Sequence, residues 1–202
     1  MLGSISPVGE TSRNQRWWLT VSAYTLASTV AGAVVGAVPA VAGEALAGIV
    51  PVSAPLRRAA LAGVRAVAAA VDPAGHGRLP TWHRQVDERW LTTYRGWVYG
   101  AGFGAQLGLG VVTIVASAAT YAMLAAALLS ASWRTGLVIG AVFGAVRSLP
   151  LLLMARVRSA GHLHAVTRRV SEAQHRMHHL TVAGQGTLAI AALGAAVAMW
   201  VP

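Results

Sequence analysis

The sequence predicts an all-α protein, a polytopic bundle of transmembrane helices with about five spans (four to six). Hydrophobic residues make up 55% of the chain and charged residues only 11%, whereas about a quarter of the residues are charged in a soluble domain. The mean hydropathy is +0.57. A stretch of 38 residues, Gly96 to Trp133, carries no charge. A helix needs about 20 apolar residues to cross a bilayer, so this stretch exceeds one untilted crossing.

Composition also excludes several classes of function. The 202-residue chain has no cysteine, which excludes disulfides, thiolate metal sites and thiol relays. All 16 basic residues are arginine and the net charge is +10. Because the arginines flank apolar segments, anionic lipid headgroups explain them better than nucleic acid does. We therefore expect the lipid bilayer as the partner and a multi-pass location in the cell's inner (cytoplasmic) membrane.

Four apolar segments are expected to cross the membrane after an N-terminal tail, residues 1–16. They are residues 17–50, 97–130, 135–155 and 181–200, within a single transmembrane domain, residues 17–202. A fifth stretch, residues 56–71, is shorter and carries Arg65. A six-helix alternative bends the first segment into a hairpin at Pro39.

The fifth stretch determines the topology. If residues 56–71 cross, the N-terminus is cytoplasmic and 11 arginines lie inside against three outside. If they lie in the interface, the N-terminus is outside and 12 arginines lie inside against three. The positive-inside rule does not separate these models. Both place the loops 72–96 and 156–180 in the cytoplasm. We favour crossing, because the stretch is apolar nearly all round.

Glycines recur every fourth residue in three of the predicted helices: Gly32, Gly36, Gly100, Gly104, Gly108, Gly140 and Gly144. Small residues at this spacing let helix backbones approach closely in a membrane, so we expect helix packing here. The alternative is a substrate path beside the glycines. A shift of 76 residues aligns Gly32 with Gly108 and Arg58 with Arg134. This predicts a two-repeat architecture, with chance similarity as the alternative.

Three charged residues lie within the apolar stretches: Glu44, Arg65 and Arg147. Each costs at least about 2.5 kcal/mol near the bilayer centre unless it is paired or hydrated. We expect Glu44 to pair with one of the arginines or to hold a proton. Gln106 in the central segment also needs a partner outside its own helix. These four residues are the candidates for a transport site, and a buried ion pair that fixes helix register is the alternative.

Metal and enzyme chemistry have little support. His175 and His179 are four residues apart, a spacing that can chelate a metal, but they are weak candidates. The surrounding pattern favours an amphipathic helix on the membrane surface. No hydrolase triad, phosphate-binding glycine loop or zinc-protease motif is present. We therefore expect no metal, no cofactor and no enzymatic activity.

Two glycine-rich stretches carry a family resemblance. The segment from Arg84 to Thr113, including Arg95-Gly96-Trp97-Val98-Tyr99-Gly100, and the segment from Gly140 to Pro150 resemble bacterial membrane proteins related to the cytochrome c biogenesis (CcdA/DsbD-type) and methylamine-utilisation transmembrane families. Thiol-relay members of that group use a cysteine pair that this chain lacks. The resemblance therefore implies a two-repeat helical fold, and a role in maturing or exporting a component of a partner.

Two functional hypotheses follow. The first is a small transporter or permease whose pathway passes Glu44, Gln106 and Arg147. The second is a non-catalytic assembly or accessory membrane subunit, of the cytochrome or cofactor maturation type. Such a subunit would use its glycine faces and basic cytoplasmic helices to bind other membrane subunits.

Overall fold

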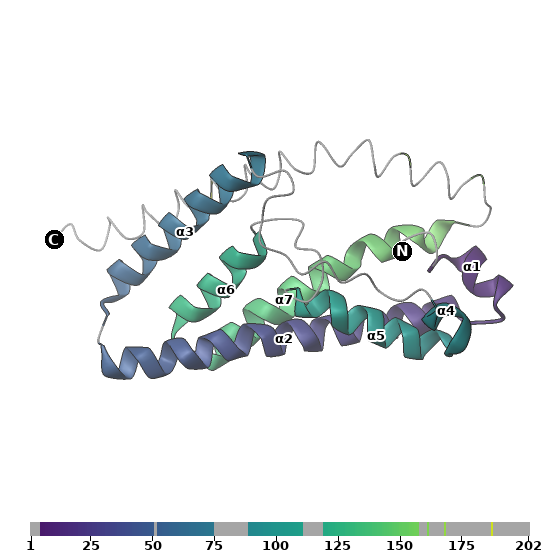
Figure 1. Ribbon diagram of the computed structural model, residues 1–202, viewed down its shortest axis with the longest axis horizontal. Helices are drawn as coiled ribbons and strands as arrows, with labels where there is room; N and C mark the ends of the chain where they lie inside the picture. Colours follow the sequence, from purple (N-terminus) through teal and green to yellow (C-terminus); the bar gives the residue numbers. More distant parts are fainter. Residues whose placement is uncertain are drawn as a thin grey trace.

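The computed structural model describes residues 5–50, 52–74, 89–110 and 119–157, and the single positions 161, 168 and 187. All regular structure in these ranges is helical, so the predicted all-α class is confirmed. The helices are α1 (Pro7–Ser12), α2 (Trp17–Ile49), α3 (Ala54–Ala74), α4 (Trp90–Thr93), α5 (Gly96–Leu109), α6 (Ala119–Ser130) and α7 (Trp133–Leu152), and a short 3₁₀ turn, η1 (Leu153–Arg156), continues α7 (Figure 1).

Helix α2 forms the long axis of the molecule. Its 33 residues correspond to about 50 Å at 1.5 Å per residue, which exceeds the hydrocarbon thickness of about 30 Å. Pro39 lies inside the helix without ending it. The six-helix alternative, a hairpin at Pro39, is therefore wrong. Residues on both sides of the proline, Gly36 and Ala40, pack against Gly136 of α7, and this contact supports a continuous helix.

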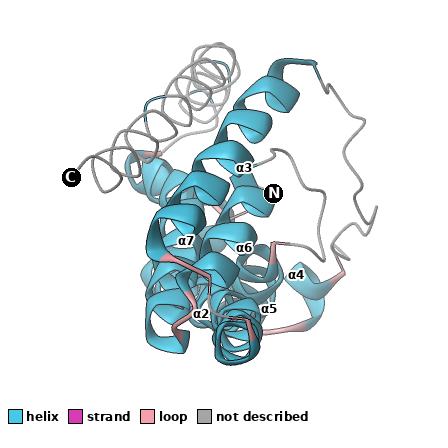
Figure 2. Cartoon of the chain, turned by 90° about the vertical axis from the view of Figure 1, so that its left-hand side faces the viewer, coloured by secondary structure: helices cyan, strands magenta, loops and turns pink. Residues whose placement is uncertain are grey.

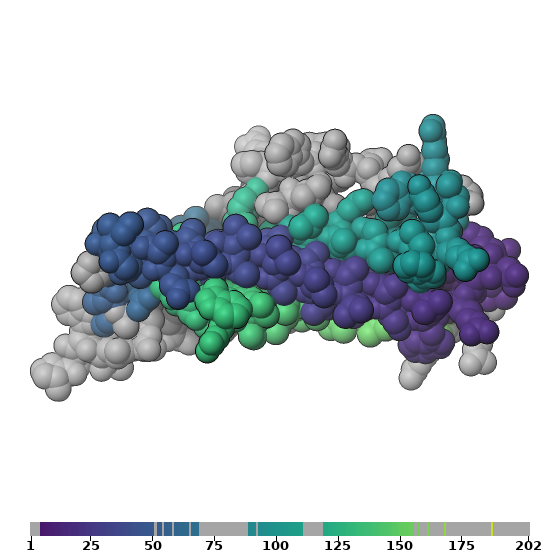
Figure 3. Space-filling view, turned by 90° about the horizontal axis from the view of Figure 1, so that it is seen from below, coloured from purple at the N-terminus to yellow at the C-terminus, as the bar shows by residue number. Residues whose placement is uncertain are grey.

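Helix α2 lies between α5 and α7, which pack on it along different faces (Figures 1 and 3). Helix α5 runs parallel to α2, since Gly100 meets Thr20 and Gly108 meets Ser28. Helix α7 runs antiparallel to it, since Gly144 meets Ser28 but Gly136 meets Ala40. Near its end α2 contacts α6, and α3 turns back from that end to pack on α6 (Figure 2).

The predicted central span, residues 97–130, is not one helix. Helix α5 ends at Leu109, and its capping residue Gly110 adopts the left-handed region with φ of 65°. The described part of α6 begins at Ala119, and residues 111–118 lie outside the described residues. Helix α5 measures about 21 Å at 1.5 Å per residue, which is shorter than a crossing.

Within the described residues, two helices are long and apolar enough to cross a membrane: Trp17–Ile49 and Trp133–Ala155. In each, only 28% of the most apolar window is buried, whereas the core helix of a soluble protein is mostly buried. Large side chains such as Leu26 and Val38 are 67% exposed, while the buried positions of α2 include Gly32, Gly36 and Ala40. The apolar side chains therefore face outward, as expected in lipid.

Several sequence predictions remain outside this test. Residues 54–74 form helix α3, but α3 is not among the helices apolar enough to qualify as a span. The fourth predicted span, residues 181–200, most of the loops 72–96 and 156–180, and the His175–His179 pair lie outside the described residues. The two predicted repeats differ, since α2 is continuous where α5 and α6 are separate; the repeat stays a prediction.

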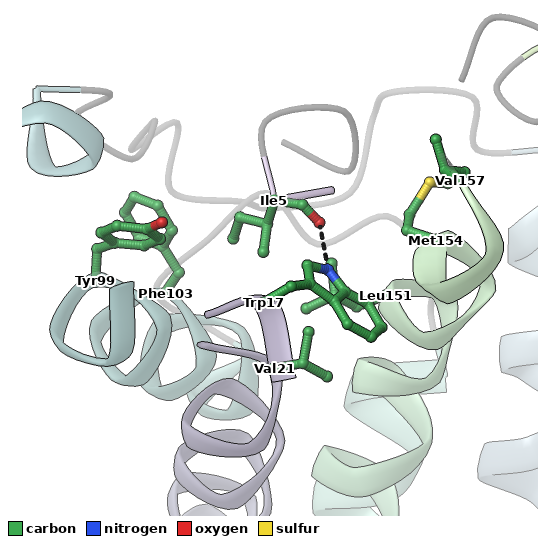
Figure 4. Close-up of a cluster of buried hydrophobic side chains, with 8 residues drawn as sticks. All are labelled: Ile5, Trp17, Val21, Tyr99, Phe103, Leu151, Met154 and Val157. Carbon is green, nitrogen blue, oxygen red and sulfur yellow. Dashed lines mark hydrogen bonds between the residues drawn. The ribbon is translucent and has the colours of Figure 1, made fainter. Parts of the chain in front are cut away.

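Residues 5–16, predicted as a tail, fold against the bundle. Ser6 caps α1 by accepting a hydrogen bond from the Gly9 N–H at 3.2 Å. The indole N–H of Trp17 donates to the Ile5 carbonyl at 3.3 Å (Figure 4). A cluster of buried apolar side chains lies here, and joins this segment to α2, α5 and the end of α7: Ile5, Trp17, Val21, Tyr99, Phe103, Leu151, Met154 and Val157.

Candidate functional site

The contact between α2 and α7 consists largely of glycine backbone. A Cβ atom at Gly36 would overlap the carbonyl oxygen of Gly136 and lie 2.8 Å from Cα of Gly140. A Cβ at Gly32 would overlap the Gly140 carbonyl oxygen and lie 3.0 Å from Cα of Gly144. The four predicted glycines of these two helices therefore lie in a close helix contact.

The contact between α2 and α5 follows the same rule on another face of α2. A Cβ at Gly104 would overlap the Tyr24 carbonyl oxygen, and one at Gly108 would overlap that of Ser28. At Gly100, a Cβ would lie 2.5 Å from the Thr20 carbonyl oxygen. Backbone atoms of α2 thus fill the space beside these glycines, which argues against a substrate path there.

Ser28 joins three helices. Its hydroxyl is buried and donates to the Gly144 carbonyl of α7 at 2.8 Å. Its own carbonyl faces Gly108 of α5 and Gly144. The polar atoms of this residue are therefore part of the helix contact.

Glu44 does not pair with an arginine in the described structure, contrary to the expectation. It is exposed near the end of α2, and its Oε2 accepts a hydrogen bond from the Trp133 N–H at 3.1 Å. Trp133 is the first residue of α7, whose N-cap Ser132 makes no side-chain capping bond. Glu44 therefore supplies the negatively charged cap that the N-terminus of α7 favours.

A buried acid that sequence analysis did not single out, Glu10, lies at the opposite end of α2. Its side chain has no exposed surface. Oε1 accepts from Arg13 Nη2 at 2.8 Å and from the Tyr99 hydroxyl, and Oε2 accepts from the Thr20 hydroxyl at 2.8 Å. The carboxylate therefore binds α1 to both α2 and α5.

Neighbouring groups complete this cluster. The Gln15 Oε1 accepts from the Gly96 N–H, the first of α5, at 3.0 Å. The Arg13 guanidinium also lies 5.8 Å from the centre of the Tyr99 ring. Burial lowers the pKa of Arg13, but its hydrogen bond to Glu10 and its attraction to Tyr99 and Glu10 raise the pKa above its ordinary value. Arg13 thus stays charged, and the cluster is an electrically balanced clamp.

One sequence signal could have located this clamp. Ser6-Pro7 is a helix start, with serine at the N-cap and proline at the first helical position. A helix from Pro7 would place Glu10 and Arg13 three residues apart on one face. Residues 1–16 were instead predicted to be a tail, so this signal went unused.

Arg147 lies in the interior of the bundle between α5, α6 and α7. A Cβ atom added to Gly110 would lie 3.2 Å from Nη1 of Arg147 and 3.4 Å from Cγ2 of Thr120. Tyr24 of α2 lies within electrostatic range of the guanidinium. Nη1 is buried and makes no hydrogen bond within the described part of the chain.

The guanidinium of Arg147 is directed away from the C-terminal end of α7. Its Cζ lies 5.3 Å from the centre of the Phe143 ring, which belongs to the preceding turn. Arginines that extend to the interface direct their charge towards water. The nearer end of α7, Leu152, is five residues away in the opposite direction. Arg147 therefore presents its charge to the interior.

The other candidates contribute less to this site. Gln106 is half-buried on α5, one turn before Gly110, and makes no hydrogen bond to the residues that the structure describes. Arg65 lies in α3, and its side chain is outside the described residues. Glu44 is far from Arg147. It caps Trp133, and the 14 residues of α7 from Trp133 to Arg147 span about 21 Å.

Comparison with protein-family models, curated proteins and solved structures finds no match. Within the described residues, no group of three or more histidine and acidic side chains could hold a metal ion. The function must therefore be argued from the geometry of the two charged sites, the Glu10 clamp and the Arg147 site.

Proposed function

We propose that the chain is a small multi-pass transporter of a bacterial inner membrane, with its substrate site beside Arg147. One observation carries the proposal: a buried guanidinium nitrogen lacks a partner in the described residues at the point where α5 stops. Transporters commonly bind substrates where helices are interrupted, and unpaired charges inside membrane domains mark such pathways. Glu44 leaves the proposed pathway because it caps α7.

The packing of α5 on α2 supports a topology for this transporter. The Gln15–Gly96 hydrogen bond joins the start of α2 to the start of α5. If α2 crosses the membrane, the chain must cross back between Ile49 and Trp90. The crossing model for residues 56–71 is therefore favoured. The interfacial model is not, because it puts Arg16 and Arg95 on opposite sides of the membrane.

The distribution of charge supports a cytoplasmic N-terminus. Arginines at the starts of α2, α4 and α5 gather at one end of the bundle: Arg13, Arg16, Arg89 and Arg95. The opposite end carries Arg134 at the start of α7 and Arg57 and Arg58 at the start of α3. The positive-inside rule assigns the end with more arginines to the cytoplasm.

Thiol labelling tests the transport proposal, because the chain has no cysteine. Thr120→Cys places a thiol of nearly the same size beside Gly110, and Ala127→Cys provides a matched control two turns further along α6. Both positions are buried, at 4% and 0% exposure. If the site opens to water, a small hydrophilic methanethiosulfonate modifies Cys at 120 in membranes, and Cys at 127 remains unmodified.

The outcomes separate the hypotheses. Modification at 120 but not 127 supports a water-accessible pathway. Equal protection at both positions, with full modification of both after denaturation, means that the site is sealed and contradicts transport.

A second candidate, an accessory membrane subunit, is favoured by an apolar groove on the outer face of α2. The groove has a volume of about 530 Å³ and is lined by apolar residues: Val30, Ala33, Val34, Ala37, Val38, Val41 and Leu137. Alanines at 33 and 37 would let a partner helix approach. Co-purification of a stoichiometric membrane protein, lost on Ala33→Leu and Ala37→Leu but retained with Gly48→Ala, would support this function.

A further inference from the structure

We infer that Arg147 binds an oxyanion, a carboxylate or phosphate group, inside the bundle. This inference rests on the proposed function and names its substrate class. It is based on the charge balance around Arg147, the direction of its guanidinium, and the position of Gly110 beside it.

The charge of Arg147 has no counter-ion among the described residues. Of the three acids in those ranges, Glu10 and Glu44 are bound elsewhere, to the clamp and to the N-terminus of α7. The third, Asp72, is near the end of α3, and its side chain lies outside the described residues. The ion pair that the described residues form is Arg13–Glu10. Residues 111–118, which follow α5, contain no acid. A buried charge without a partner is strongly unfavourable, and a bound anion would offset that cost.

The guanidinium geometry suits an oxyanion. Arginine offers five N–H donors in a planar fork that matches two oxygens of a carboxylate or phosphate. The Arg147 Cζ lies over the Phe143 ring, 5.3 Å from its centre, which positions the group, and Nη1 is left without an acceptor in the described structure. A ligand oxygen would complete its bonding.

Gly110 lies directly beside the Arg147 guanidinium. Two features favour glycine at this position. Its φ is 65°, and a Cβ atom on residue 110 would lie 3.2 Å from Nη1 of Arg147. Thr120 and Tyr24 bring hydroxyl-bearing side chains close to the same region. The ligand would thus lie between α2, α5, α6 and α7, the helices that a transporter must move against each other.

The test measures anion binding to the purified full-length chain in phosphatidylcholine nanodiscs. The probes are sodium acetate and sodium phosphate, compared with sodium chloride at equal ionic strength, and the readouts are the thermal unfolding midpoint and calorimetric titration. We expect acetate or phosphate to stabilise the protein. Arg147→Gln should weaken that binding by about tenfold or more, since hydrogen bonds between charged groups are lost.

Two variants control the interpretation. Arg147→Lys keeps the charge but loses the planar fork, so it should retain weaker binding. Arg134 lies on the same helix and stacks on Trp133 at 5.5 Å, but it is exposed. Arg134→Gln should bind the anion like the original chain. Equal loss in both glutamine variants would mean general charge attraction and would overturn the inference.

A lipid arm distinguishes the sources of the oxyanion. If phosphatidylglycerol nanodiscs stabilise the chain through Arg147 and the free anions do not, the bound group is a headgroup phosphate, and the inference holds for that source. If neither free anion nor lipid has an effect that depends on Arg147, the inference is wrong.

Anion binding and transport can fail separately. Oxyanion binding with an unreactive Cys at 120 would retain this site and contradict transport. A reactive Cys at 120 without oxyanion binding would retain transport and contradict this substrate class.

Discussion

Two charged side chains inside the bundle differ in how completely they are bonded. Glu10 accepts from three donors, Arg13, Thr20 and Tyr99, and its balanced charge suits a structural role. Arg147 has a buried nitrogen without a partner in the described structure. A saturated group stabilises the fold, whereas an unsaturated group retains bonding capacity for a ligand.

The first prediction concerns the stability of the Glu10 clamp. Glu10→Ala leaves the hydroxyls of Thr20 and Tyr99 buried without their acceptor, which should lower the free energy of unfolding by about 2–4 kcal/mol. It should also release α1 and speed tryptic cleavage after Arg13 and Arg16. Thermal unfolding in detergent and limited proteolysis measure the two effects.

Glu10→Gln provides the matched control for this prediction. Its amide oxygen can still accept from Tyr99 and Arg13, and the Thr20 hydroxyl can turn to accept from its NH₂ group. We expect a smaller loss of stability and near-normal proteolysis. Unchanged stability and proteolysis in the alanine variant would show that the clamp does not hold α1.

At the scale of the helices, the glycine spacing predicted which helix faces pack closely. It did not predict which helices pack against each other. A repeat of four marks one face of a helix, so Gly32, Gly36 and Gly140 could be placed on packing faces from sequence. Which faces meet depends on contacts between residues more than 100 positions apart, such as Ser28 and Gly144.

The break between α5 and α6 was not predicted, and the physical reason is the composition of the segment. Residues 96–133 are uncharged and mostly apolar throughout, so hydropathy gives no boundary within them. The boundary depends on Gly110, whose positive φ ends α5. The segment contains several glycines, and the sequence does not show which of them adopts a positive φ.

The second prediction tests close packing between α2 and α7. A methyl group at Gly36 would overlap the backbone of Gly136, and backbone cannot move aside as a side chain can. Gly36→Ala should therefore cost about 1–3 kcal/mol of unfolding free energy.

Gly48 provides the matched control, because it lies in the same helix and a Cβ atom added there would have nothing within 4 Å. Gly48→Ala should be neutral or stabilising by up to about 1 kcal/mol. Thermal unfolding of the two variants in the same detergent makes the comparison, and equal midpoints would argue against this packing.

The third prediction concerns the cap of α7. Glu44→Ala removes the acceptor of the Trp133 N–H and should cost about 1 kcal/mol, as the loss of an N-cap does. Glu44→Gln keeps an acceptor oxygen, so it should lose less. A proton-carrying or transport role would instead make both variants inactive with unchanged unfolding midpoints, so transport assays and unfolding together distinguish the two roles.

For the whole molecule, the sequence predicted the all-α class and the apolar character, and the structure adds how the helices are directed. The large apolar side chains of α2 and α7 face outward, including Leu26, Val38 and Val142 at 67%, 67% and 57% exposure. A surface this apolar on a monomer in water would favour aggregation. Parallel packing of α2 and α5 then constrains the topology, because it places residues 12 and 93 near the same end of the bundle.

The fourth prediction tests that topology with single cysteines at exposed positions: Ser12→Cys, Thr93→Cys and Thr135→Cys. If α2 and α7 cross the membrane and the arginine-rich end is cytoplasmic, a membrane-impermeant maleimide should label only Cys at 135 in intact cells. In permeabilised cells, the maleimide should label all three cysteines, which controls for their reactivity.

The interfacial model for residues 56–71 predicts labelling at 12 and protection at 93. Because the Gln15–Gly96 bond joins those two ends, opposite behaviour at 12 and 93 would contradict the arrangement of α2 and α5 itself. Labelling of all three in intact cells would contradict the crossing of α2 and α7.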